Sequence, residues 1–252
     1  MPTIGGEQVE GRQAVRELLL AGTRRVKQVM VANDLDEADI LTDILELAAE
    51  LRVPVVEMPR RKLEAEARTE APQGVLAKAA PLAEADIEEL AKTRPGHPAP
   101  FLVLLDGVTD PGNLGAILRS ADCAGVTGVV LPRHRSVHVT PTVTKAAAGA
   151  VEHLPIALVG GLPAAITRLR DQGVWVYGLD GVGQRTIFDL PALGADPVAL
   201  VLGAEGSGLS RLVRQRCDEV VSIPMNGHLS SLNVAAAASV VCFEVARRRL
   251  LA

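Results

Sequence analysis

The sequence from Phe101 to Arg119 reads FLVLLDGVTDPGNLGAILR and contains three segments of different character. Its first five residues are all apolar, which indicates a strand buried on both faces, because a half-exposed strand alternates apolar and polar side chains. A polar loop rich in glycine and proline follows, and a helical pattern begins near Asn113. A buried strand leading through a loop into a helix is the repeating unit of a parallel α/β sheet.

The same unit recurs through the rest of the C-terminal half. We expect further apolar strands at 128–131, 154–158, 174–177, 198–202 and 220–223. Helical patterns occupy 114–124, 143–150, 163–171, 209–216 and 232–250. Strands of this kind alternating with helices predict a parallel sheet covered by helices on both faces. The pattern alone favours an ordinary Rossmann-like arrangement.

The N-terminal part is predicted to form a smaller α/β unit. Helical patterns at 11–20 and 38–51 alternate with strand patterns at 26–31, 53–56 and 73–77. The segment 94–100, RPGHPAP, contains three prolines and one glycine, which exclude regular structure. We therefore predict domains at 1–79 and 99–252, joined by a linker at 80–98.

The composition, with 48% hydrophobic and 22% charged residues, is typical of a globular protein. No signal-peptide pattern opens the chain, and no apolar run reaches the roughly 20 residues of a membrane-spanning helix. The odd number of cysteines, Cys123, Cys217 and Cys242, without metal-ligand spacing indicates reduced thiols. We expect a cytoplasmic protein without a membrane segment or a metal site.

The formal net charge of −4 argues against a general polyanion binder. Basic residues nevertheless cluster locally at 24–27, 60–62, 133–135 and 247–249. Each cluster is compatible with a solvated surface or with phosphate contacts. Aromatic residues make up only 2%, which argues against recognition by stacking many bases on aromatic side chains.

Three polar loops follow predicted strands, where ligands bind in open α/β sheets. The first contains Asn113, a good helix cap, and leads to Arg119, whose guanidinium in an apolar helix must pair or face a cleft. The second, GAEGSG at 203–208, combines three glycines with Glu205. A tight turn explains the glycines, but a carboxylate there needs a partner.

The third loop, IPMNGHLSSLN at 223–233, precedes an alanine-rich helix. Ser230 or Ser231 could serve simply as the cap of that helix. No dinucleotide-binding Gly-x-Gly-x-x-Gly and no phosphate-binding Gly-Lys-Ser/Thr occurs in the three loops. A Rossmann oxidoreductase stays as a rival interpretation, which NAD(H) binding would support.

Taken in order, Asn113-x-Gly-x-x-x-Arg119, Leu202-Gly203-x-Glu205-x-x-Gly208 and the segment from Ile223 to Val234 resemble the three motifs of the SpoU (TrmH-like) RNA 2′-O-ribose methyltransferases. This family belongs to the SPOUT superfamily. The opening segment 5–19 resembles the L30e-like RNA-binding domain of the subgroup that modifies a guanosine of 23S rRNA. The resemblance covers the whole chain.

The resemblance implies a C-terminal α/β domain with a deep trefoil knot and a parallel sheet, and a smaller N-terminal L30e-like α/β domain. It also implies a homodimer, a structured RNA substrate and S-adenosylmethionine as cofactor. The implied catalytic residues are Asn113, Arg119, Glu205, Ser231 and Asn233. The implied cofactor-binding residues are Leu202, Gly203, Gly208, Ile223, Met225 and Leu232. Candidate RNA contacts are Arg24, Arg25 and Lys27.

The implied reaction methylates a guanosine ribose in 23S rRNA without a metal. Arg119 would assist removal of the hydroxyl proton or stabilise the alkoxide electrostatically. Two alternatives remain within this resemblance: a tRNA substrate, and a non-catalytic protein that binds RNA or assists ribosome assembly on the same fold.

Overall fold

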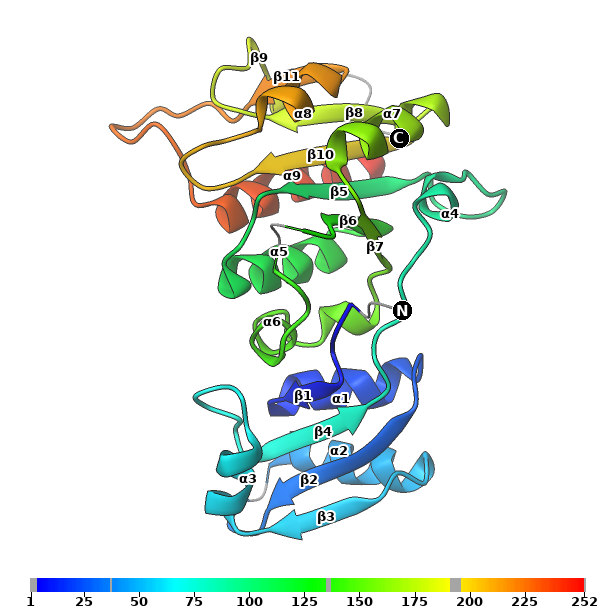
Figure 1. Cartoon of the computed structure of the whole chain (residues 1–252), viewed down its shortest axis with the longest axis vertical. Helices are drawn as coiled ribbons and strands as arrows, with labels where there is room; N and C mark the ends of the chain where they lie inside the picture. The colour runs from blue at the N-terminus through cyan, green and yellow to red at the C-terminus, as the bar shows by residue number, and fades with distance from the viewer. Residues whose placement is uncertain (1–3, 37, 135–136, 191–195, 252) are drawn as a thin grey trace.

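A computed structural model describes residues 4–36, 38–134, 137–190 and 196–251 of the chain. Figure 1 shows two α/β units that follow one another along the long axis of the molecule. The N-terminal unit carries a four-stranded sheet and the C-terminal unit a seven-stranded sheet.

The N-terminal unit contains β1 (Gln8–Glu10), α1 (Arg12–Ala21), β2 (Val26–Ala32), α2 (Asp39–Glu50), β3 (Val55–Met58), α3 (Arg60–Glu66) and β4 (Val75–Ala79). Its sheet has the order β1-β4-β2-β3, with β4 antiparallel to both of its neighbours. Buried side chains of α1 and α2 pack on one face of this sheet, and Leu63 of α3 packs on the other.

The C-terminal unit contains β5 (Phe101–Asp106), α5 (Pro111–Cys123), β6 (Gly128–Pro132), α6 (Pro141–Ala146), η1 (Ala150–Glu152), β7 (Ile156–Val159), α7 (Leu162–Asp171), β8 (Trp175–Leu179), β9 (Arg185–Thr186), η2 (Ile187–Asp189), β10 (Val198–Gly203), α8 (Arg211–Arg216), β11 (Glu219–Ser222) and α9 (Val234–Arg249). The strand order is β7-β6-β5-β10-β8-β11-β9, and each adjacent pair is parallel.

Strand β5 shows why a wholly apolar strand belongs in the middle of this sheet. Phe101, Val103 and Leu105 pack into the core with α5 and α9, and Leu102 and Leu104 pack into the core with α7. All five side chains are fully buried. Because successive side chains of a strand point to opposite faces, helices must cover both. The predicted α/β class with a parallel sheet is therefore confirmed.

Strand β11 lies between β8 and β9, which precede it in the chain and are joined by the short segment 180–184. The chain thus returns into a gap that its own earlier strands enclose. It then leaves toward α9, which packs beside α5 (Figure 1). This order agrees with the threaded topology that the family resemblance implies, and it differs from a simple Rossmann sheet.

The predicted linker makes ordered contacts in its first half. Residues 87–91 form α4 (Ile87–Ala91), whose Ile87 and Ala91 pack into the core beside α7. Strand β1 and helix α3 were not predicted, because the one is three residues long and the other buries only Leu63.

The C-terminal helix is attached to the base of the sheet by Arg249. Its guanidinium donates to the carbonyl oxygens of Ala99 (2.6 Å), Pro100 (2.9 Å) and Asp196 (3.1 Å). It also lies 5.1 Å from the centre of the Phe101 ring. Arginine serves this purpose because its fork of donors can satisfy several acceptors at once.

We expect Arg249→Ala to lower the free energy of unfolding by about 1–3 kcal/mol, because three hydrogen bonds to backbone carbonyls, two of them partly buried, are lost together. Thermal unfolding followed by circular dichroism measures the effect. Arg94→Ala is the control, since Arg94 forms only an exposed pair with Glu89 and should shift the melting temperature little. Equal melting temperatures for the two variants would contradict this role.

Candidate functional site

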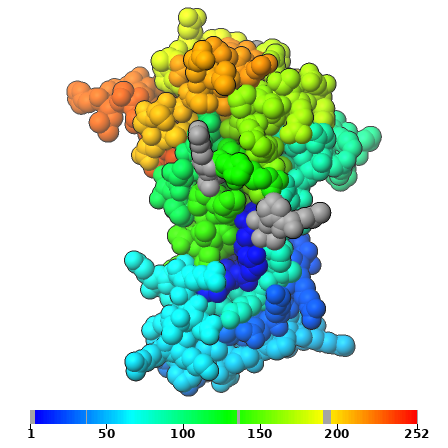
Figure 2. All heavy atoms as spheres, in the orientation of Figure 1, coloured from blue at the N-terminus to red at the C-terminus, as the bar shows by residue number. Residues whose placement is uncertain are grey.

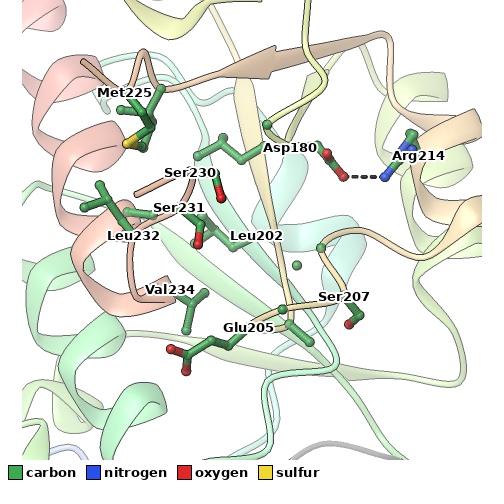
Figure 3. A pocket seen from close by; sticks show the side chains of 18 residues that line it. Asp180, Leu202, Glu205, Ser207, Arg214, Met225, Ser230, Ser231, Leu232 and Val234 are labelled. Atoms are coloured by element: carbon green, nitrogen blue, oxygen red, sulfur yellow. Dashed lines mark hydrogen bonds and ion pairs between the residues drawn. The ribbon is translucent and has the colours of Figure 1, made fainter. Parts of the chain in front are cut away.

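The carboxyl ends of β8, β10 and β11 surround a cavity of about 330 Å³ (Figure 3). Its walls come from the loops that follow these strands and from the first turns of α9. The structure places all six predicted cofactor residues on its walls: Leu202, Gly203, Gly208, Ile223, Met225 and Leu232. Glu205 and Ser231, two of the predicted catalytic residues, line it as well.

Gly203 ends β10 where the loop folds back against the strand. A Cβ atom on Gly203 would lie 2.2 Å from the carbonyl carbon of Gly208 and 2.5 Å from the nitrogen of Leu209. Only glycine allows this approach of backbone to backbone. The reversal turns the following residues, including Glu205, into the cavity wall.

The cavity has apolar and charged walls. Leu202, Ile223 and Leu232 provide apolar surface. Asp180 and Arg214 form an ion pair at 2.5 Å on one side, away from Glu205 (Figure 3). Such a cavity suits a ligand with both a flat apolar part and charged groups.

Asn113 connects two of the loops. Its Nδ2 atom lies 3.5 Å from Oε2 of Glu205, and its Oδ1 atom accepts a 3.0 Å hydrogen bond from Nδ2 of Asn233. Glu205 is exposed, so water and Asn113 both solvate its carboxylate. The structure therefore brings Asn113, Glu205 and Asn233 together beside the cavity.

The residues that cap α5 and α9 differ from the caps that the sequence suggested. Asp110 caps α5, since its Oδ1 accepts from the backbone nitrogen of Asn113 at 2.6 Å. Asn233 caps α9 by accepting from the nitrogens of Ala235 and Ala236, so Ser230 and Ser231 do not cap it. The side chain of Asn113 is consequently free to join Glu205 and Asn233.

Arg119 lies apart from these residues. It stands six positions after Asn113, or about 9 Å along the axis of α5 and on another face of the helix. Its side chain is exposed rather than enclosed, and no ion pair or hydrogen bond to it occurs within the described ranges. The first part of the expectation, that its guanidinium pairs, is therefore wrong for the described residues of a single chain.

The three candidate RNA contacts divide into two kinds. Arg25 and Lys27 are exposed on the N-terminal unit. The prediction that Arg24 contacts RNA is corrected by the structure. Only 6% of its side chain is exposed, and it forms a 2.6 Å ion pair with Glu152 of the C-terminal unit. With its donors used inside the protein, Arg24 has no free edge for a phosphate.

Asp180 and Arg214 were not among the predicted site residues. Asp180 directly follows β8, so the rule that ligands lie beyond the carboxyl ends of strands would have included it. Arg214 lies within α8 and carries no such signal.

The described residues contain no group of three or more His, Cys, Asp or Glu that could hold a metal ion. Within the same ranges no helix is long and apolar enough to cross a membrane. Burial raises the pKa of the Cys217 and Cys242 thiols to about 12, so neither is a thiolate at neutral pH.

Comparison with known families matches both parts of the chain. The SpoU rRNA Methylase family matches residues 100–243. The family described as RNA 2′-O ribose methyltransferase substrate binding matches residues 8–85.

Curated relatives match over nearly the full length. The chain is 42% identical to the 23S rRNA (guanosine-2′-O-)-methyltransferase RlmB of Pseudomonas putida, over 96% of this chain and 97% of the relative. It is 41% identical to an uncharacterized tRNA/rRNA methyltransferase of Mycobacterium marinum, over 96% of this chain and 77% of the relative.

Solved structures show the same architecture. The SpoU methyltransferase AviRb from Streptomyces viridochromogenes, in complex with AdoMet, superposes with a TM-score of 0.79 and 27% identity, covering 97% of this chain and 91% of AviRb. An AdoMet-bound rRNA methyltransferase from Sinorhizobium meliloti superposes with a TM-score of 0.78 and 26% identity, covering 97% and 88%.

We expect Gly203→Ala to weaken S-adenosylmethionine binding about tenfold or more. The added methyl group forces the loop off the strand, and overpacking of this kind costs about 1–3 kcal/mol. Isothermal titration calorimetry measures the affinity.

Gly160→Ala is the matched control, because Gly160 also follows a strand but has nothing within 4 Å of its added Cβ. Unchanged affinity in Gly203→Ala would show that this cavity is not the cofactor site.

Proposed function

Because the chain belongs to the SpoU rRNA methylase family, we propose that it transfers a methyl group from S-adenosylmethionine to the ribose 2′-hydroxyl of a guanosine in 23S rRNA. The chain is an S-adenosylmethionine-dependent RNA methyltransferase. One observation carries the proposal: the predicted cofactor residues all line one cavity, and Asn113, Glu205 and Asn233 meet at its edge.

The residues of the cavity fit the cofactor. Its volume of about 330 Å³ lies within the roughly 300–1,000 Å³ that small-molecule sites occupy. Leu202, Ile223 and Leu232 provide apolar surface for an adenine ring. Gly203 itself lines the cavity beside these residues. Asp180 and Arg214 offer opposite charges to polar groups of the cofactor.

The protein's task in this reaction is to orient the ribose and assist loss of its proton. The bound cofactor supplies an activated methyl group as its sulfonium. A ribose hydroxyl is a poor nucleophile, so alignment and proton removal limit the rate. Asn113 and Asn233 are fixed by their mutual hydrogen bond, and Glu205 and Ser231 line the cavity beside them. We assign to these four residues the orientation of the target nucleotide.

We propose that the active form is a homodimer that uses α9 and the exposed face of α5. Along α9 an exposed stripe contains Ala236, Val240 (36% exposed) and Phe243 (50% exposed), spaced at helical intervals. The opposite side of α9 is buried in the core, so this helix is apolar on both faces. A helix of this kind is normally covered on all sides.

The same dimer would give Arg119 a role in catalysis. Arg119 is exposed on α5, the neighbour of α9, and a single chain leaves it outside the cavity. A second copy seated on this face would bring a guanidinium toward the site from outside. There Arg119 would bind the target's phosphate and stabilise the developing alkoxide, or accept its proton.

The proposed substrate, a guanosine in 23S rRNA, can be tested with the wild-type protein. We expect it to methylate 23S rRNA prepared from cells that lack the gene, at one ribose, in the presence of S-adenosylmethionine. Mapping of ribose methylation identifies the nucleotide. Methylation of tRNA alone would favour the other substrate class, and RNA binding without transfer would favour a non-catalytic protein. An rRNA substrate places the reaction in the cytoplasm.

We expect Arg119→Ala to lower single-turnover methylation about 10²–10³-fold while cofactor affinity and melting temperature stay near wild type. Arg119→Lys should remain severely impaired, since lysine lacks the bidentate fork. Arg168→Ala is the control, because Arg168 is an exposed helical arginine paired with Glu88. Near-normal turnover of Arg119→Ala would refute the catalytic assignment.

Mixed dimers test whether Arg119 acts across the interface. Alone, Arg119→Ala chains are expected to react about 10²–10³-fold more slowly, and Gly203→Ala chains are expected to react slowly when the S-adenosylmethionine concentration is kept well below their raised Kd. When they are mixed, one site of each heterodimer would combine an intact cavity with an intact arginine from the other chain. Recovery of part of the activity supports this arrangement, and its absence places Arg119 with its own chain's cavity.

A further inference from the structure

Arg24 and Glu152 form a buried ion pair between the two units. Nε and Nη2 of Arg24 donate to the two carboxylate oxygens of Glu152, at 2.8 and 2.6 Å. Nη1 donates to the carbonyl oxygens of Gly6 and Ala80, at 2.6 and 2.5 Å. The side chains are 6% and 0% exposed. A charge pair this deeply buried is favourable only with its partners in place, so it selects one orientation of the units.

Three further contacts surround this pair. The backbone nitrogen of Gly6 donates to the carbonyl oxygen of Val139 at 2.9 Å, and the nitrogen of Val139 donates to Ile4 at 3.1 Å. On α1, a carboxylate oxygen of Glu17 lies 3.0 Å from Nε2 of His153. The junction is therefore held by backbone and side-chain contacts on both sides of Arg24.

The surfaces also fit closely at the junction. A Cβ atom on Gly149, which precedes η1, would lie 2.4 Å from the Cβ of Glu17. Helix α1 thus rests directly on the backbone of the C-terminal unit. Lys145 of α6 donates to the carbonyl oxygen of Ala71 in the N-terminal unit. Figure 2 shows the two units in contact across this junction.

Packing contacts also connect the ion pair to the edge of the cavity. Glu152 belongs to η1, which follows α6 in the chain. Helix α6 packs against α5 so closely that a Cβ on Gly115 would lie 2.4 Å from the Cβ of Ala146. The first turn of α5 carries Asn113, which bonds Asn233 beside the cavity. A continuous packed path therefore connects Arg24 to Asn113.

We propose that Arg24 and Glu152 are positioning residues that set which nucleotide is methylated. The proposal rests on the function proposed above. RNA held by the N-terminal unit meets the cavity at one fixed distance and orientation because the buried pair fixes the two units. The favoured substrate is a folded RNA whose target ribose stands at that distance from the element that the N-terminal unit binds. A short RNA that cannot reach both units gains nothing from the pair.

The experiment uses Glu152→Gln and Arg24→Lys in the full chain, since both keep the side chains near their original size. We expect unchanged S-adenosylmethionine affinity and RNA affinity within about twofold of wild type. On the folded rRNA substrate, kcat should fall about 10- to 100-fold with little change in KM, because a 1 Å misplacement alone costs about 10²-fold. Methyl groups should also appear at neighbouring riboses. Small-angle scattering should show a larger radius of gyration.

Three comparisons distinguish an effect on the placement of the RNA from an effect on folding. Asp34→Asn removes an exposed ion pair with Arg60 inside the N-terminal unit and should leave rate and target unchanged. A short RNA that contains only the target should be methylated equally slowly by wild type and both variants. Lys145→Ala, an exposed junction contact, should reduce the rate in the same direction but less, and it provides the readout if a buried variant does not fold.

Variants that methylate the same single ribose at the wild-type rate would overturn the inference. Loss of cofactor binding in Glu152→Gln, with Lys145→Ala unchanged, would also overturn it, because the pair would then support only the fold. A wild-type chain that methylates no RNA contradicts the proposed function instead. Even then, small-angle scattering of the wild type and the variants tests whether Arg24 and Glu152 fix the orientation of the two units.

Discussion

Strand β10 lies between β5 and β8, although it follows both in the chain. In register, Gly203 pairs with Asp106 of β5, and Leu202 pairs with Leu179 of β8. Three loops far apart in the sequence therefore emerge at the same edge of the sheet. Beyond β10 the chain folds back so closely that a Cβ on Gly203 would lie 2.2 Å from the carbonyl carbon of Gly208, which only glycine permits. The cavity is a consequence of this placement.

The sequence predicted the buried strands because their signal is local. Five consecutive apolar residues in β5 require helices on both faces, whatever the order of the strands. The order itself depends on pairings between distant segments, and periodicity says nothing about them. The insertion of β11 between β8 and β9 was therefore accessible only through the family resemblance. Strand β1 was missed because its polar residues are stabilised by tertiary contacts: Glu10, fully buried, accepts hydrogen bonds from the backbone of Arg68 and Thr69.

From the sequence, the loops of the site could be located because they follow predicted strands and contain glycines. Capping could not be decided, since Asp110 and Asn113 are both suitable caps and the choice depends on where the backbone turns into α5. The answer matters for chemistry: Asp110 caps the helix, and this leaves Asn113 free to bond Asn233, which is 120 positions away. Asn233 performs two tasks, because its Oδ1 caps α9 while its Nδ2 holds Asn113.

Arginines show the limit of charge patterns most clearly. Arg24 and Arg25 are neighbours in one basic run, yet Arg24 is buried against Glu152, which lies 128 positions away, and Arg25 is exposed. A guanidinium cannot lose its charge, so its burial depends wholly on finding a partner in the fold. Arg119 is the reverse case, a cation among apolar residues that the fold leaves exposed. The single chain thus completes the junction between its units internally but leaves the expected cation of the reacting centre on its surface. In the homodimer proposed above, the α5 and α9 face is what brings this cation to a cavity, which a single chain does not do.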